Sequence, residues 1–505
     1  MFTAITEDLT IVTVVFGIGL LVWGFLRSRP YGKLGFLAWL QSVVLMVPWL
    51  LVFGLAALGV MLNLALVLGL LVASSAVYIG LGNRVRSLKQ EQGEARRAAA
   101  IAKTTDADAA APAAGDSKPD QPLPTGQPPQ GEEEIVPIPA EDLKAIQGIF
   151  GIESFFATET IPYQEGAIFR GNLRVDPEVA YAKLDERLQA ALGDRYRLFL
   201  VENQDGKPVI IVLPSSRDPQ PAATPQKILA VILALFTVAT CLESAGLLLG
   251  FDFFYAPNRI SETLPLASGI LAILAAHEIG HWVLARRYNV RLGWPFYIPT
   301  LQIGSFGALT RIESVLPNRS VLFDIAFAGP AAGGILSLGM LLTGLLLSHQ
   351  GSLFQIPSQF FQGSILVGTL ARVVLRDALQ APIVDVNPLV VLGWLGLVIT
   401  ALNLMPAGQL DGGRIVQAIY GRKTASRTTI GTLILLGLAS LVNPLALYWA
   451  ILIVFLQRDL ERPSLNELTE PDDARAALGL LALFLMVVTL LPLTPSLAGR
   501  LGIGM

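Results

Sequence analysis

Two histidines and a glutamate, His277, Glu278 and His281, form the pattern His-Glu-x-x-His. Residues four apart share one face of a helix, so both imidazoles can bind one metal ion while Glu278 acts on a water molecule as a base. A lone histidine on an apolar helix is more often a packing residue. This chain has only 3 histidines, however, and two of them fall in the pattern, which favours a metal site. The third, His349, is interpreted as a polar helix end.

The pattern lies in an apolar run, residues 264–285, that is long enough to cross a bilayer. Ionisable groups inside a membrane span are costly and are usually retained for function. Arg286 and Arg287 follow the run, and basic residues favour the cytoplasmic side of a membrane. At about 1.5 Å per residue, His281 then lies roughly a turn and a half inside that face. We expect the metal to be reached from the cytoplasm.

A zinc enzyme needs three protein ligands and one open position. Asp411 follows an apolar span that begins at Pro388 and is expected to run parallel to the His-Glu helix. The parallel direction brings Asp411 to the same depth as the two histidines. We therefore predict that His277, His281 and Asp411 bind Zn2+. The alternative interpretation of Leu410-Asp-Gly-Gly413 is a turn that ends a helix.

Other carboxylates compete less well for this role. Asp459 and Glu461 stand among basic residues past the expected membrane edge and are predicted to be solvated. Glu243 lies in a further apolar run, residues 229–250, where it is functional, a protonated or hydrogen-bonded packing residue, or part of a helix end.

The stretch between the two motifs contains Gly304, Ser305, Phe306 and Gly307, followed by alternating residues up to Ile312. This pattern predicts a short extended segment with close backbone approach. Beside the metal, such a segment could bind an unwound peptide by adding a strand. The alternative is a surface loop. The small residues of FAGPAAGG, which come next, predict close helix packing.

Composition identifies the kind of protein that carries these motifs. The 505 residues are 53% hydrophobic and 15% charged, with a mean hydropathy of +0.59, which is typical of a polytopic membrane protein. We expect an all-α membrane fold of about ten spans, with both ends outside, and a small α+β module. The net charge of -3 gives no reason to expect a nucleic-acid partner. The single cysteine, Cys241, excludes an intramolecular disulfide and a cysteine-rich metal site.

Charge and complexity divide the chain into five expected parts. The parts are an N-terminal region of three spans (1–83), a flexible tether rich in Ala, Pro and Gly (84–134), a cytoplasmic α+β module (135–217), the metal-binding membrane core (227–462) and a C-terminal span (463–505).

Turn and cap residues predict the secondary structure of the module. We expect a helix over 139–150, a strand over 167–175 and a helix capped by Asp176 that ends at Gly193. Residues 196–202 and 208–214 are predicted to form a hairpin. Nothing in this module suggests catalysis, so a binding or regulatory role is expected.

The paired motifs carry a resemblance. HEIGH, followed about 130 residues later by NLMPAGQLDGG, resembles the site-2 protease family of intramembrane zinc metalloproteases, peptidase family M50, over roughly residues 227–462. The resemblance implies that Glu278 is the general base and that Asn403 contacts the substrate backbone or oxyanion. It also implies that Gly304 to Gly307 belong to a substrate-binding strand. Because a helix hides its carbonyls, a helix-weak transmembrane segment of a single-span protein in the lipid bilayer is the expected substrate.

A narrower resemblance comes from Gly171-Asn-Leu-Arg174 in the module. Together with the other motifs, this tetrad is similar to the chloroplast proteases named for ethylene-dependent gravitropism deficiency and yellow-green leaves, and to their cyanobacterial relatives. No transit-peptide pattern is visible at the start of the chain, which favours a bacterial, cyanobacterial protein in a plasma or thylakoid membrane. No PDZ-like module is visible.

Two other functions are compatible with intramembrane ligands. A metal transporter would distribute polar groups across several spans, whereas here they concentrate near one face. A catalytically silent membrane scaffold is the second alternative, although relatives of that kind typically lack the His-Glu motif. The sequence gives no indication of the oligomeric state.

Overall fold

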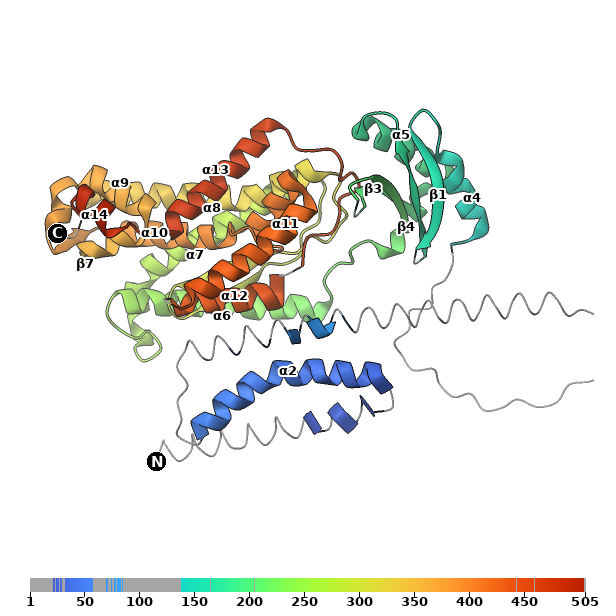
Figure 1. The fold of residues 1–505 in the computed structure, drawn as a ribbon. Coiled ribbons are helices and arrows are strands. Elements are labelled where there is room, and N and C mark those ends of the chain that lie inside the picture. Colours follow the sequence, from blue (N-terminus) through green and yellow to red (C-terminus); the bar gives the residue numbers. More distant parts are fainter. Residues whose placement is uncertain are drawn as a thin grey trace, which may run out of the picture. The chain divides into compact units, whose positions relative to one another are not determined.

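The structure is a computed structural model (Figure 1). It describes residues 138–503, apart from 164, 204, 442 and 458, and parts of residues 21–84 that include helix α2 (Gly32–Ala57). Most of the expected three-span region, and the expected tether beyond its first residue, lie outside the described residues.

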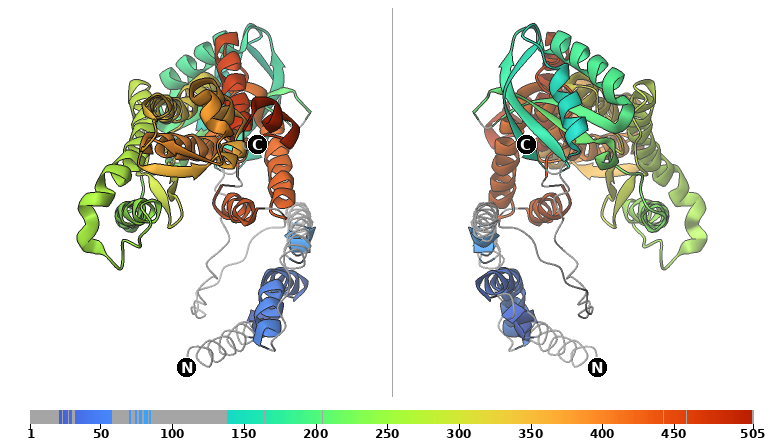
Figure 2. Two further views of the ribbon diagram at one scale, coloured as in Figure 1. Left: turned by 90° about the vertical axis from the view of Figure 1, so that its left-hand side faces the viewer. Right: turned by 90° about the vertical axis from the view of Figure 1, so that its right-hand side faces the viewer.

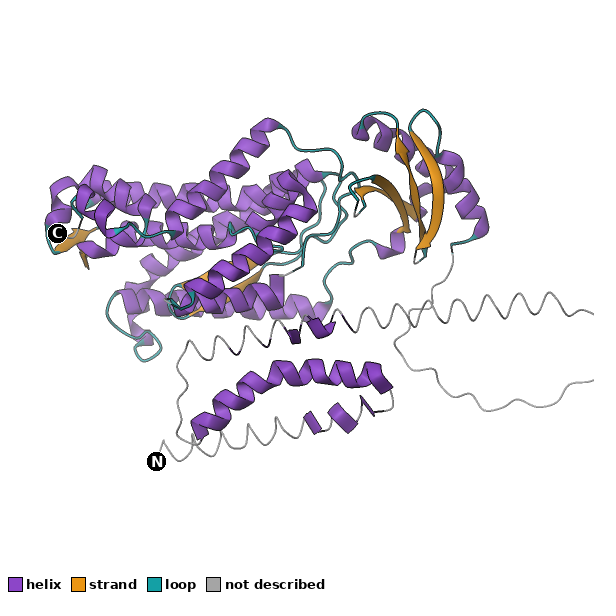
Figure 3. Ribbon diagram, in the orientation of Figure 1, coloured by secondary structure: helices purple, strands orange, loops and turns teal. Residues whose placement is uncertain are grey.

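Helices dominate the membrane part of the molecule, and the sheets are small (Figure 3). Among the described residues, four helices are long and apolar enough to cross a membrane. These are α6 (Thr224–Leu248), α7 (Ile260–Arg287), α8 (Arg319–Leu347) and α13 (Asp473–Leu490). A fifth apolar helix, α10 (Pro388–Asn403), has 16 residues. The helical membrane fold is confirmed, whereas the count of ten spans is not.

Side-chain caps fix where the central helices begin. Asn318 accepts a hydrogen bond from the N–H of Val321 at 3.0 Å and so caps α8, and Asn387 caps α10 by accepting from Leu389 at 3.0 Å. α8 packs against both α7 and α10. This packing brings the His-Glu helix and the end of α10 close to each other.

A short antiparallel hairpin follows α7, and its second strand is the extended segment that the glycine-containing stretch predicted. β5 (Phe296–Thr300) pairs with β6 (Gly304–Leu309), and α6 packs against both strands. Gly304 and Gly307 have φ angles of 83° and 107°, a region that glycine adopts without strain. The predicted extended segment is confirmed.

Helix α11 (Asp411–Ala439) follows α10 and is interrupted at Gly421, where φ is 78° and ψ is 171°. The first half of α11 therefore ends with unsatisfied carbonyl groups. Arg319, which is buried, donates hydrogen bonds of 2.7 Å to the carbonyls of Ala418 and Ile419. α12 (Pro444–Leu452) follows α11 in the chain.

The α+β module contains two helices and four strands, and both helices and three of the strands were predicted. Its elements are α4 (Ala140–Ile149), β1 (Phe155–Tyr163), β2 (Gly166–Leu173), α5 (Pro177–Leu192), β3 (Tyr196–Glu202) and β4 (Pro208–Pro214). The antiparallel sheet has the order β1-β2-β4-β3, and α4 and α5 share one hydrophobic core with one of its faces (Figure 2). β1 was not predicted.

The GNLR tetrad lies at the end of β2, beside β1. A Cβ atom on Gly171 would lie 2.1 Å from the carbonyl oxygen of Phe156 and 2.8 Å from the ring of Phe155. Only glycine fits where β2 approaches β1 this closely. Asn172 and Arg174 are exposed.

The segment Leu465–Glu467, just before α13, ties the module to the membrane core. The N–H of Leu200 in β3 donates to Leu465 at 2.7 Å, and the N–H of Glu467 donates to Leu200 at 3.0 Å. On its other side, this segment donates to the carbonyls of Leu316 and Pro317 at 2.8 and 3.0 Å. The segment thus covers the edge of the module's sheet and fixes it to the start of α8.

Residues 349–386 form a small subdomain that the sequence predicted only in part. β7 (Phe354–Pro357) pairs with β8 (Ile383–Val386), and α9 (Ile365–Leu375) lies between them in the chain. Residues near α14 (Pro495–Leu501) join the same core. His349 lies exposed just after α8, which confirms its interpretation as a helix end.

Candidate metal centre and active site

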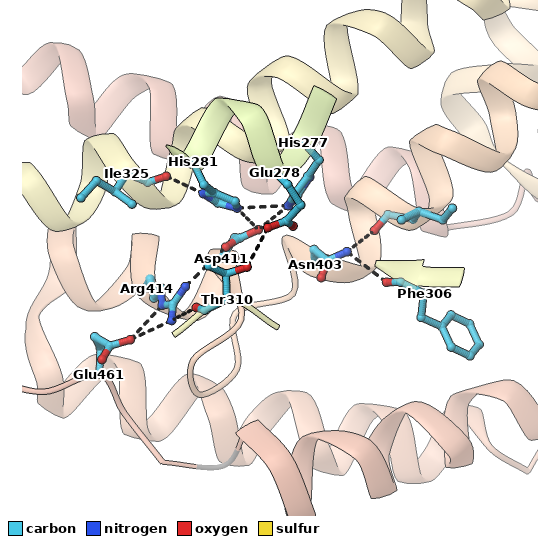
Figure 4. A network of polar contacts seen from close by, with 11 residues as sticks. His277, Glu278, His281, Phe306, Thr310, Ile325, Asn403, Asp411, Arg414 and Glu461 are labelled. Atoms are coloured by element: carbon cyan, nitrogen blue, oxygen red, sulfur yellow. Dashed lines mark hydrogen bonds and ion pairs between the residues drawn. The ribbon is translucent and has the colours of Figure 1, made fainter. Parts of the chain in front are cut away.

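Three donor atoms from two helices converge on one point (Figure 4). Nε2 of His277 lies 3.1 Å and Nε2 of His281 lies 3.4 Å from Oδ2 of Asp411. The two Nε2 atoms are 3.1 Å apart. Ligands about 2.0–2.2 Å from a tetrahedral zinc ion would be roughly 3.3 Å from one another. The structure therefore brings the three predicted ligands together at a spacing that fits Zn2+.

The ring of His281 is held in the orientation that a metal ligand requires. Its Nδ1 lies 2.8 Å from the carbonyl oxygen of Ile325 in α8. A carbonyl only accepts, so Nδ1 carries the proton and Nε2 offers its lone pair to a metal. Both imidazoles are buried, with exposed fractions of 6% for His277 and 4% for His281.

Small residues let α8 approach the metal-binding face of α7. A Cβ atom on Gly329 would lie 2.2 Å from Nε2 of His281, and one on Gly280 would lie 2.4 Å from the carbonyl oxygen of Ala328. The close packing predicted for FAGPAAGG is thus confirmed.

Glu278 adjoins the ligands, and its carboxylate is oriented by a residue that sequence reasoning missed. Oε2 of Glu278 accepts a 2.7 Å hydrogen bond from Oγ1 of Thr310, which directly follows β6. The ligand atoms of His277, Glu278 and His281 all lie within 4.8 Å of one another. A water molecule at the metal would be within reach of this carboxylate.

The prediction that Glu461 is solvated is wrong. Sequence reasoning placed Glu461 in solvent, but its exposed fraction is 7% and Oε2 accepts from Arg414 at 2.9 and 3.0 Å. Arg414, one turn after Asp411, also donates to the carbonyl of Thr310 at 2.9 Å. The burial is tolerated because the two charges neutralise each other. Arg414 directly follows the Asp-Gly-Gly motif, but its position in the sequence does not identify its acidic partner. Asp459 is exposed, as predicted.

Asn403 lies beside the predicted substrate-binding strand. Its Nδ2 donates to the carbonyls of Ile399 at 2.9 Å and Phe306 at 3.2 Å, so both amide hydrogens are used within the chain. A void of about 10 Å³ between Asn403, Gly307 and the pair His277 and Glu278 has room for about one water molecule. This void is too small to hold a peptide.

Glu243 has a structural explanation. Its exposed fraction is 4%, and Oε2 accepts from the backbone N–H groups of Phe253 at 2.9 Å and Phe254 at 3.2 Å. Of the interpretations left open by the sequence, the hydrogen-bonded packing residue is the one observed.

A His-Glu-x-x-His helix, completed by a distant carboxylate among apolar helices, defines a membrane-embedded zinc metallopeptidase. Comparison with known proteins identifies the family. The profile described as Peptidase family M50 matches residues 265–443, and the profile of the EGY3 middle domain matches residues 144–221, within the range of the α+β module and the linker after it.

Curated relatives agree with these profiles. The chain is 40% identical to the probable zinc metalloprotease EGY2, chloroplastic, of Arabidopsis thaliana, over 70% of this chain and 65% of that protein. It is 38% identical to the EGY1 protein of Arabidopsis thaliana, over 74% of this chain and 75% of that one. The EGY1 protein of Oryza sativa subsp. japonica is 36% identical over 73% and 70%, respectively. The chain belongs to peptidase family M50, the site-2 protease family, among its EGY-type zinc metalloproteases. No solved structure matches it.

Proposed function

We propose that this metalloprotease cleaves transmembrane segments of single-span membrane proteins within the lipid bilayer. The observation that carries the proposal is the convergence of His277, His281 and Asp411 at 3.1 to 3.4 Å. The cluster is buried among helices of membrane-spanning length, beside a carboxylate that is not part of the proposed ligand set. Water-dependent peptide hydrolysis is the reaction that such a set performs in a zinc enzyme.

Each side chain has a role in the proposed reaction. His277, His281 and Asp411 would hold zinc, which lowers the pKa of a water molecule and polarises a carbonyl when bound. Glu278 takes the proton from the attacking water and passes it to the leaving amine. Asn403 contacts the substrate backbone or the developing oxyanion once its bond to Phe306 is released.

Substrate binding follows from the hairpin. A transmembrane helix must unwind locally before attack, because its carbonyls are otherwise hydrogen-bonded within the helix. β6 belongs to a two-stranded sheet, so a strand can add at its second edge. The residues Gly304, Ser305, Phe306 and Gly307 would line that strand. The small void beside Asn403 supports a closed resting state that opens when the hairpin shifts.

The proposed function includes the membrane in which the protein lies and the side on which its site opens. Arg286 and Arg287 at the end of α7 favour a cytoplasmic opening of the site. A cyanobacterial plasma or thylakoid membrane is the proposed setting, without a nucleic-acid partner, and the relatives are named as chloroplastic proteins. We propose the five parts given above, with residues 227–462 as the catalytic core.

An Asp411→Ala variant tests the ligand set. Purified wild-type protein is expected to contain about one zinc ion per chain and to cleave a single-span substrate in proteoliposomes. The variant should lose most of its zinc and its cleavage, whereas Asp459→Ala, at an exposed carboxylate, should keep both. Unchanged zinc content in Asp411→Ala would remove the third ligand. Zinc flux across the bilayer without cleavage would favour a transporter.

Thr310 is expected to position the proposed base. Thr310→Val removes the 2.7 Å hydrogen bond to Glu278, so we expect kcat to fall about 10- to 100-fold with little change in KM. Thr310→Ser, which keeps the hydroxyl, should restore most of kcat. Equal kcat values for the valine and serine variants would show that the hydroxyl has no part in orienting Glu278.

A further inference from the structure

A cavity of about 670 Å³, here called the module cavity, lies between the α+β module and the catalytic core. Phe199, Ile211 and Leu213 line it from β3 and β4. These residues alternate with those that pack under α4 and α5, so they belong to the other face of the sheet. The other walls include α11 around its kink at Gly421, residues 312–316, residues 217–219 and the stretch 461–470 before α13.

Backbone hydrogen bonds hold both walls of the module cavity in place. The segment Leu465–Glu467 joins β3 to the start of α8, as described above. The chain that leaves the module is fixed as well, because the backbone N–H of Ala222 donates to the side-chain carboxylate of Glu313 at 3.0 Å. The module cavity is therefore a built feature of the fold.

The module cavity continues from the proposed substrate-binding strand. After β6 the chain passes Thr310, which contacts Glu278, and residues 312–316 then line the cavity. Glu461 also lines it, and its partner Arg414 donates to the carbonyl of Thr310. A peptide extended along β6 advances about 3.3 Å per residue. Beyond the catalytic groups it would thus run on toward the module cavity.

Positive charge is in excess around the module cavity. Its lining contains six basic and five acidic side chains. Two of the acids, Glu461 and Asp218, form ion pairs with arginines that are not in the lining. One of the bases, Arg217, is paired in the same way with Glu165, which leaves five basic and three acidic side chains. Burial raises the pKa of a further acid, Glu467. Among the basic residues of the lining, Arg427 and Arg462 are exposed and so can meet a bound molecule.

We propose that the module cavity binds the extramembrane segment of the substrate as an extended stretch that carries apolar side chains and carboxylates. The apolar side chains would lie on the uncovered face of β3 and β4, and the carboxylates would face Arg427 and Arg462. This inference rests on the proposed proteolytic function and assigns the choice of substrate to the module. Anionic lipid headgroups could also meet these arginines, but they would not use the apolar sheet face.

The test uses the full chain in proteoliposomes of zwitterionic lipid. Three single-span substrates share one transmembrane segment and carry a tail of alternating leucine and aspartate, the same tail with lysine for aspartate, or no tail. We expect the wild type to cleave the acidic-tailed substrate with a kcat/KM about five- to tenfold above that of the lysine-tailed one, mainly through KM. The double variant Arg427→Glu, Arg462→Glu should reverse the preference and cleave the tail-less substrate at the wild-type rate.

A matched charge reversal, Lys183→Glu, lies on α5, which covers the other sheet face, and should keep the wild-type preference. Equal cleavage of both tailed substrates by the wild type, or an unchanged preference in the double variant, would overturn the inference. A preference that appears only after anionic lipid is added would assign the arginines to lipid and overturn it too. Failure of the wild type on the tail-less substrate would contradict the proposed function itself, and this inference with it.

Discussion

Replacing Gly329 with alanine is expected to remove most of the zinc and to lower proteolysis at least about 100-fold. The added methyl group would lie 2.2 Å from Nε2 of His281, closer than any non-bonded contact. Either the imidazole leaves the metal centre or α8 moves away from α7, and the ligand spacing is lost in both cases. Metal analysis of the purified variant, beside its cleavage rate in proteoliposomes, measures both effects.

Gly339→Ala is the matched control, because it adds the same methyl group to the same helix. Nothing lies within 4 Å of a Cβ atom at Gly339, so zinc content and cleavage should equal those of the wild type. If Gly329→Ala kept its full zinc content, the close approach of α8 to the imidazole would not be needed for metal binding.

The second large effect is expected for Glu278→Gln. The amide cannot take a proton from water, so kcat should fall about 10³- to 10⁴-fold while KM changes little. Zinc should remain bound, since the proposed ligands are His277, His281 and Asp411. Single-turnover cleavage of a labelled substrate, together with metal analysis, separates the chemical step from metal loss.

Glu262→Gln serves as the control, because Glu262 lies on the same helix and forms an exposed ion pair with Arg259. Its cleavage rate should match that of the wild type. Substantial activity in Glu278→Gln would show that another group acts as the base and that Glu278 does not transfer the proton.

The convergence of the three proposed metal ligands could be predicted because local rules place them. Helical spacing puts His277 and His281 on one face, and the direction of α10 brings Asp411 to their depth. Thr310 and the pair of Arg414 and Glu461 could not be predicted in this way. Their contacts join residues 32 and 47 positions apart, and nothing in the local pattern fixes such a pairing.

In the α+β module, too, the elements with local sequence patterns could be predicted and the others could not. Turn and cap residues predicted α4, α5 and the hairpin of β3 and β4. β1 was missed because its sequence, FFATETIPY, has no clean alternation and contains Pro162, which suits only an edge strand. β7 and β8, with 4 residues each, are too short for a periodic pattern.

The double pairing of Leu465–Glu467 has a consequence for biosynthesis. This segment is translated after β3 and after the start of α8, the two elements that it joins. Until it leaves the ribosome, the edge of β3 remains open and the module is not anchored to the catalytic helices. Docking of β3 is therefore a late event in assembly, and nascent chains that stop before residue 465 would lack the link between β3 and the start of α8.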